Sequence, residues 1–265
     1  MIRFFPFLGG GPVVAVIRLQ GMISAGGRGA TLNDAGLAPL IEKAFRRGKP
    51  KAVALVVNSP GGSPAQSSLI AARIRRLSEE KKIPVHAFVE DVAASGGYWL
   101  ACAADDITVD PNSIVGSIGV ISAGFGFHEL LARYGIERRV YTAGKSKSLL
   151  DPFQPEKAAD VKRLKEIQNV VHEGFIDHVK ARRGARLGER DLFDGSVWVG
   201  AQAVNVGLAD GVGHLVPEMK RRYGDKVRFA VYHQRKPLLG RIGGRLAADA
   251  IAGVEERAAF ARFGL

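Results

Sequence analysis

The chain has 265 residues, a mass of 28.3 kDa and a formal net charge of +12 at pH 7. Hydrophobic residues make up 46% and charged residues 24%, which is typical of a folded globular protein and excludes a disordered or fibrous one. The length suits one α/β domain with a helical appendage better than two full domains. The excess of positive charge favours anionic partners, such as nucleic acid, acidic lipids or acidic peptides.

The sequence predicts neither a membrane-spanning helix nor a signal peptide. The uncharged N-terminal stretch from Phe4 to Ile17 is shorter than the about 20 apolar residues of a helical span, and Pro6 and Pro12 interrupt it. Cys102 is the single cysteine and is expected to be a small buried side chain, so no disulfide forms within the chain. We therefore expect a cytoplasmic protein, either free or peripheral on the inner face of the cell membrane.

In chain order, the first part of the sequence alternates between predicted strands and helices. Strands are expected at Val13–Leu19, Ala52–Val57 and Pro84–Val89, and the helices between them at Asn33–Arg47 and Ala65–Lys82. Short, continuous apolar runs are typical of parallel strands that are covered on both faces. The alternation therefore predicts right-handed crossovers and a parallel sheet.

The elements predicted further along the chain are shorter or more polar. The segment Ala93–Ala104 is rich in small residues and is expected to turn from a loop into a helix. The other expected elements are strands at Ile107–Val109, Ile114–Ile121 and Glu137–Thr142, a long amphipathic helix at Pro155–Arg182, a short helix at Gly200–Val206, and a helical, Arg-rich tail at Leu238–Leu265.

Two glycine-containing loops follow predicted strands at the carboxyl edge of the sheet, where open α/β folds bind ligands. The first is N-S-P-G-G at Asn58–Gly62, whose glycines either form a tight turn or leave N–H groups free to donate to an oxyanion. The second is A-A-S-G-G-Y at Ala93–Tyr98. Its Ser95 either caps a helix or, being flanked by small residues, attacks a substrate carbonyl beside the N–H of Gly96.

A third, polar loop at Gly144–Phe153 presents Lys145 and Lys147. One interpretation is a pair of exposed lysines, and the other is a lysine enclosed away from water, which loses its proton more easily and acts as a base. The G-K-S in this loop does not complete a phosphate-binding motif, because Arg139 stands where the motif needs a glycine. The histidines show no metal-binding spacing and there is no cysteine cluster, so no metal or other cofactor is expected.

Together these motifs resemble those of the signal peptide peptidase A family of serine peptidases, peptidase family S49. The resemblance also rests on G-S-I-G-V at Gly116–Val120 and on D-G-S-V-W-V-G-A-Q-A-V-N-V-G-L-A-D at Asp194–Asp210. It implies the ClpP/crotonase fold, an α/β fold of repeated ββα units with a mostly parallel sheet, here with a helical C-terminal extension. We expect an N-terminal segment at 1–12, a peptidase domain at 13–225, and a basic C-terminal strand and helical extension at 226–265.

The resemblance also implies roles for individual residues. Ser95 is the expected nucleophile and Lys147 the expected general base, with Lys145 as the fallback. The N–H groups of Gly61 and Gly96 are the expected oxyanion donors. The residues expected to pair with an extended peptide substrate are Ser117, Ile118, Gly119 and Val120.

The function implied in this way is that of a serine endopeptidase with a Ser/Lys dyad, which hydrolyses peptides such as cleaved signal peptides through an acyl-enzyme. Self-association is expected, because active sites in the family form where neighbouring units meet. The basic C-terminal tail is expected either to contact anionic lipid or to pack against its own chain or a neighbouring subunit, and no nucleic-acid partner is expected. Many family members carry an N-terminal membrane anchor, which is not expected here.

Two other functions stay open from the residues alone. A non-catalytic, membrane-associated assembly protein could have the same fold, and an acyl-CoA hydratase or isomerase shares the crotonase fold. Neither requires Ser95 together with Lys147, whereas the peptidase does.

Overall fold

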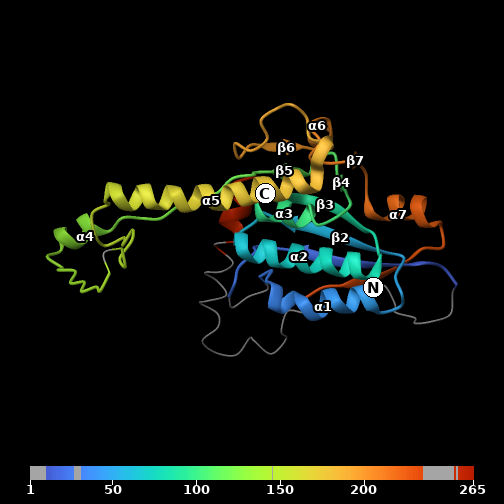
Figure 1. Cartoon of the computed structure of the whole chain (residues 1–265), viewed down its shortest axis with the longest axis horizontal. Coiled ribbons are helices and arrows are strands. Elements are labelled where there is room, and N and C mark those ends of the chain that lie inside the picture. Colours follow the sequence, from blue (N-terminus) through green and yellow to red (C-terminus); the bar gives the residue numbers. More distant parts are fainter. Residues whose placement is uncertain (1–9, 27–30, 145, 235–253, 255) are drawn as a thin grey trace. The chain divides into compact units, whose positions relative to one another are not determined.

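The computed structural model describes residues 10–26, 31–144, 146–234, 254 and 256–265 (Figure 1). The chain divides into two compact units. The first unit comprises the residues up to Ile118 and those from Asp177 onward, and the second comprises residues 119–176. The expected domain limits at residues 13 and 225 stay predictions.

An eight-stranded sheet forms the centre of the first unit, with the strand order β6-β5-β3-β2-β1-β8 and with β4 paired to β3 and β7. All pairs are parallel except β5 with β6. The strands are β1 (Val13–Gln20), β2 (Ala52–Ser59), β3 (Val85–Ala94), β4 (Asp106–Val109), β5 (Ile114–Gly116), β6 (Val197–Val199), β7 (Gly211–Val212) and β8 (Arg228–Tyr232). The predicted α/β class with a mostly parallel sheet is therefore confirmed.

Two helices, α1 (Asp34–Arg46) and α2 (Pro64–Lys81), connect β1 to β2 and β2 to β3 and lie side by side (Figure 1). Asn33 caps α1 by accepting a hydrogen bond from the N–H of Gly36 at 2.8 Å. The buried apolar side chains of the two helices include Leu37, Ile41, Ile70 and Ile74. Leu69 on α2 is 50% exposed, because the helical turn that buries Ile70 and Ile74 directs it to solvent.

Every second residue of β1 and β2 packs against a third helix, α7 (Leu215–Tyr223). Met219 of α7 is fully buried in a cluster with Val14, Ala54 and Phe88. Because successive side chains of a strand point to opposite faces, this cluster covers the other face of the sheet. Both faces of β2 are therefore covered, which explains why every residue of this strand is buried.

The remaining helices of the first unit are short. They are α3 (Gly96–Ala101), α6 (Ala201–Asn205) and a 3-10 turn at Gly184–Arg186. The expected helical tail at 238–265 lies mostly outside the described residues, and residues 256–261 of it are helical. No helix in the described part of the chain has the length and apolar character needed to cross a bilayer.

The second unit contains α4 (His128–Arg133) and the first part of α5 (Ala158–Arg183). Among its described residues, Phe175 is the one that is buried. Ile167, on the apolar stripe predicted for the long helix, is 42% exposed. The strand expected at Glu137–Thr142 is wrong: this segment has no regular structure and pairs with no described strand, and Tyr141 within it is 90% exposed.

Candidate active site

Ser95 lies at the junction between β3 and α3, in a backbone conformation that few residues adopt. Its φ is 51° and its ψ is −122°, so a non-glycine residue occupies the positive-φ region at the end of a buried strand. The residues on either side of Ser95, from Val92 to Tyr98, are buried, whereas Ser95 itself is half-buried. Its hydroxyl caps no helix amide, which removes the helix-capping alternative. The turn therefore presents the hydroxyl at the carboxyl edge of the sheet.

The N-S-P-G-G loop lies directly against this turn. A Cβ atom on Gly61 would lie 2.8 Å from the Cβ atom of Ser95 and 2.9 Å from the amide nitrogen of Gly96. A Cβ atom on Gly97 would lie 2.3 Å from the carbonyl oxygen of Ser59. Only residues without side chains allow the two loops to approach this closely, so Gly61 and Gly97 both serve this contact.

Three backbone N–H groups are candidates for stabilising an oxyanion near Ser95. The N–H of Gly61 donates to the hydroxyl of Ser59 at 3.2 Å. Within the described residues, the N–H groups of Gly62 and Gly96 donate to no acceptor, and a Cβ atom on Gly96 would lie 3.4 Å from the amide nitrogen of Gly62. The geometry therefore adds Gly62 to the predicted pair. Sequence reasoning missed Gly62, because the motif does not tell which of its two amides is already bonded.

The start of the G-S-I-G-V motif joins the same site. The N–H of Ser95 donates to the carbonyl of Gly116 at 2.8 Å, and the N–H of Ser117 donates to the carbonyl of Ser196 at 2.7 Å. Gly116 and Ser117 both have positive φ, at 105° and 50°, so β5 ends there instead of continuing to Ile121 as the sequence predicts. Ser117 and Ile118 belong to the first unit, whereas Gly119 and Val120 begin the second.

Lys147 lies in the second unit, within the turn-rich segment that follows Gly144. Its side chain is exposed, and its N–H donates to the carbonyl of Gly144 at 3.2 Å. Lys145 lies outside the described residues. The predicted base therefore lies in a different unit from Ser95.

A buried polar network supports α3 from behind. Tyr98 donates its hydroxyl hydrogen bond to the carbonyl of Leu208 at 2.8 Å, and burial raises its pKa well above the usual value. Asp210, at the end of the G-L-A-D stretch, accepts two hydrogen bonds from Arg183 at 2.7 and 3.1 Å. Burial alone would raise the pKa of Asp210, but the hydrogen bonds from Arg183 and from the N–H of Ile107 outweigh it and lower the pKa.

The ring of His178 on α5 stacks on Trp99 of α3, with centroids 4.8 Å apart. Burial lowers the pKa of His178 to about 4, so the imidazole is neutral at pH 7. Cys102 is buried as expected, and burial raises the pKa of its thiol to about 12. Within the described residues, no group of three or more His, Cys, Asp or Glu side chains could hold a metal ion.

Comparisons with known proteins bear on this site. The sequence model described as peptidase family S49 matches residues 78–222, a range that includes both Ser95 and Lys147. A solved structure of a membrane-bound stomatin-specific protease shares the fold, with a TM-score of 0.51 and 16% sequence identity, over 86% of this chain and 99% of that one.

Two relatives of the chain have names that describe different activities, an antiporter and a protease. A protein named Na(+)/H(+) antiporter NhaA from Brucella melitensis is 48% identical over 271 residues, which cover 95% of this chain and 37% of that protein. Serine protease SPPA, chloroplastic, from Arabidopsis thaliana is 35% identical over 217 residues, which cover 78% of this chain and 31% of that protein. The chain thus spans about a third of these relatives. Since the family's sequence model matches more than half of the chain, the chain belongs to peptidase family S49, a family of serine peptidases.

Proposed function

We propose that the chain is a serine endopeptidase in which Ser95 is the nucleophile and Lys147 the general base. The observation that carries the proposal is the turn at Ser95, which has positive φ, leaves its hydroxyl half-buried and uncommitted, and lies against two glycine amides. A nucleophile on a sharp strand-to-helix turn has small neighbours, which lets a substrate carbonyl approach it.

In the proposed reaction, the Ser95 oxygen attacks a peptide carbonyl while Lys147 takes the hydroxyl proton. The C–N bond then breaks, the lysine returns the proton to the leaving amine, and an ester links the acyl group to Ser95. A water molecule attacks this ester, giving its proton to the lysine, and the serine oxygen leaves and regains a proton. The N–H of Gly96, with that of Gly62 or Gly61, stabilises the negative oxygen in both steps.

We propose that substrates bind in an extended conformation along Ser117, Ile118, Gly119 and Val120. These residues directly follow β5, whose last residue, Gly116, accepts a hydrogen bond from the N–H of Ser95. The backbone that continues from such a strand can pair with an extended peptide. The chloroplast relative is named a serine protease, and extended peptides such as cleaved signal peptides are the substrate class that we propose here.

We further propose that neighbouring copies of the chain share each active site. Lys147 is exposed within its own chain, whereas a lysine that accepts a proton near neutral pH needs to be shielded from water. The second unit also exposes several large apolar side chains, including those of Ile121, Phe125 and Tyr141, at 68%, 80% and 90%. A second copy that covers this surface would enclose the lysine and complete the site.

Complementation between two inactive variants tests this proposal. Ser95→Ala and Lys147→Ala are each expected to lose peptidase activity and to keep the far-UV circular dichroism of the wild type. Mixed and reassembled, a Lys147→Ala copy supplies the serine and a Ser95→Ala copy supplies the lysine. Simple counting of junctions predicts recovery of about a quarter of the wild-type activity at equal amounts.

Exposed residues of the same types supply the controls. Ser68→Ala on α2 and Lys162→Ala on α5 remove a hydroxyl and an ammonium group from exposed helix positions and are expected to leave activity unchanged. If subunit exchange is verified and activity does not return, both residues act within one chain and the shared site is wrong. If Lys147→Ala stays active while Lys145→Ala does not, the base is Lys145.

A further inference from the structure

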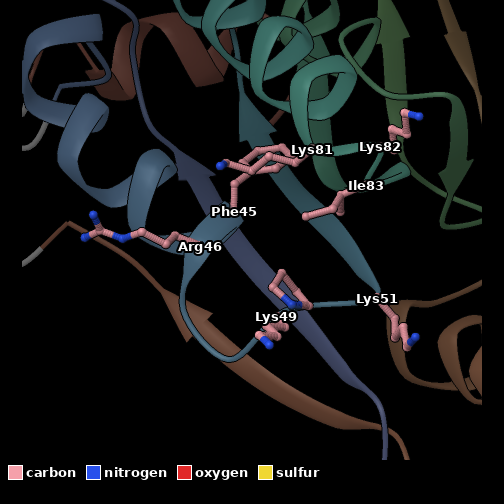
Figure 2. A pocket seen from close by; sticks show the side chains of 8 residues that line it. Phe45, Arg46, Lys49, Lys51, Lys81, Lys82 and Ile83 are labelled. Atoms are coloured by element: carbon pink, nitrogen blue, oxygen red, sulfur yellow. The ribbon is translucent and has the colours of Figure 1, made fainter.

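A basic cavity lies at the end of the sheet opposite to Ser95. It is formed where α1 and α2 end and where β2 begins, and its volume is about 460 Å³ (Figure 2). Five of its eight lining residues are cationic: Arg46, Lys49, Lys51, Lys81 and Lys82. Ser95 follows the last residue of β3, whereas Lys82 precedes the first, so the length of this strand separates the cavity from the proposed nucleophile.

The positive charge of the cavity is not balanced by nearby carboxylates. Within the described residues, none of its five cationic side chains forms an ion pair. The acidic residues of the same two helices are bound elsewhere, since Glu42 pairs with Arg73, Glu79 with Arg75 and Glu80 with Arg76, at 3.1, 3.4 and 2.8 Å. An anionic partner would therefore complement this positive charge.

Two of the lysines occupy backbone positions at which glycine is the easier choice. Lys49 has a φ of 46° and Lys82 a φ of 53°, and Lys82 ends α2 in the left-handed conformation. Glycine or asparagine is the usual residue at such a helix end. Lysine at both positions places an ammonium group at the mouth of the cavity despite the less favourable backbone.

The arrangement of the cations favours an extended anionic surface over one small anion. Figure 2 shows the nitrogen atoms of Arg46, Lys49, Lys51 and Lys82 spread around the opening and not directed to a common point. A single phosphate ion would need donors that converge on it. Spread lysines and arginines instead match the dispersed negative charges of an anionic lipid bilayer.

The start of β1 borders the same edge of the sheet. The N–H of Lys51 donates to the carbonyl of Val13, so the first residue of β1 lies beside the cavity.

We propose that the basic cavity and its rim are a docking surface for anionic phospholipid bilayers. Docking there would hold the amino edge of the sheet against the membrane and leave the carboxyl edge, with Ser95, facing away from it. This role is independent of the peptidase chemistry, because none of the cavity residues belongs to the proposed active site.

Vesicle co-sedimentation of the whole chain tests the proposal. We expect binding to phosphatidylcholine vesicles that contain about 30% phosphatidylglycerol, weaker binding at high salt, and none to phosphatidylcholine alone. The triple variant Lys49→Gln, Lys51→Gln and Lys82→Gln should bind roughly 100-fold more weakly, since each basic residue near an anionic membrane strengthens binding about fivefold. The variant's peptidase activity should match that of the wild type.

A charge-matched variant separates a specific surface from net charge. Lys157, Lys162 and Lys165 are exposed in the second unit, and their replacement by Gln removes the same number of charges. Retained binding by this variant supports the cavity, whereas an equal loss in both triple variants overturns it. Saturable binding of inorganic phosphate by calorimetry, without vesicle binding, would also overturn it, because the site would then take a free anion.

Discussion

Gly61 and Ser95 approach so closely that a single added carbon on Gly61 would lie 2.8 Å from the Cβ atom of Ser95. Real Cβ atoms essentially never lie this close to another atom. Only a glycine at position 61 therefore leaves room for the turn at Ser95 in its observed position. The position of Ser95 thus depends on a residue of a different loop, 34 positions earlier in the chain.

Gly61→Ala should therefore lower peptidase activity by about 100-fold or more, because small displacements of a nucleophile have effects of this size. It should also reduce stability by about 1–3 kcal/mol, since Gly61 has a φ of 104°. Activity on a peptide substrate and urea denaturation measure the two effects. Gly174→Ala, at a helical glycine with no atom near its added carbon, is the control and should leave activity unchanged. A folded Gly61→Ala variant with wild-type activity would show that Ser95 does not depend on this contact.

The Arg183–Asp210 ion pair should contribute to stability from about pH 4 upward. The side chain of Arg183 is 2% exposed, so Asp210→Asn leaves a buried guanidinium without its partner charge and should destabilise the fold by about 3–5 kcal/mol. The pKa of Asp210 is lowered in the folded state, so this stability is complete above the unfolded value of 3.8 and is lost as the pH falls further. Urea midpoints of both proteins from pH 7 to pH 2 measure the difference. A gap that persists unchanged at the lowest pH would mean that the charge of Asp210 is not its cause.

Protonation of His178, which stacks on Trp99 of α3, should destabilise the fold at a higher pH than protonation of Asp210 does. The folded pKa of about 4 lies below the unfolded value of 6.5, so the unfolded chain binds the extra proton first as the pH falls. The stability associated with neutral His178 is therefore present above pH 6.5 and is lost toward pH 4. His178→Phe keeps a ring against Trp99 and should show a smaller loss of melting temperature across this range. Identical losses in both proteins would assign the pH dependence to other groups.

Peptidase activity should rise with pH into the mildly alkaline range. A lysine accepts the serine proton only when it is neutral, so the active fraction of enzyme increases as protons are removed. The rate of cleavage of one peptide, measured across the range at constant ionic strength, gives the profile. A flat profile from about pH 6 to 9 would argue against a lysine base.

The sequence predicts the central sheet and the neighbourhood of Ser95 well, for physical reasons that are visible in the residues. Continuous apolar runs such as Ala52–Val57 form buried parallel strands, and parallel strands bring the loops at their carboxyl ends together. The contact of Asn58–Gly62 with the turn at Ser95 follows from this topology.

Other features depend on partners that a sequence pattern does not specify. Gly61 and Gly62 look equivalent in the motif, and the hydroxyl of Ser59 decides that the Gly61 amide is the bonded one. The segment at Glu137–Thr142 has the composition of a strand, but a strand needs a neighbour and the structure provides none within the described residues. The relation of Lys147 to Ser95 depends, on our proposal, on a second copy of the chain.

An activated Ser95 nucleophile should react covalently with a fluorophosphonate probe. We expect that the wild-type chain is labelled, that peptide mapping places the label on Ser95, and that Ser95→Ala abolishes the label while the Ser68→Ala control does not. Labelling should also fall strongly in Lys147→Ala, because the base activates the hydroxyl. A wild-type assembly that shows no label at Ser95, or a label that survives in Ser95→Ala, would mean that Ser95 is not the nucleophile.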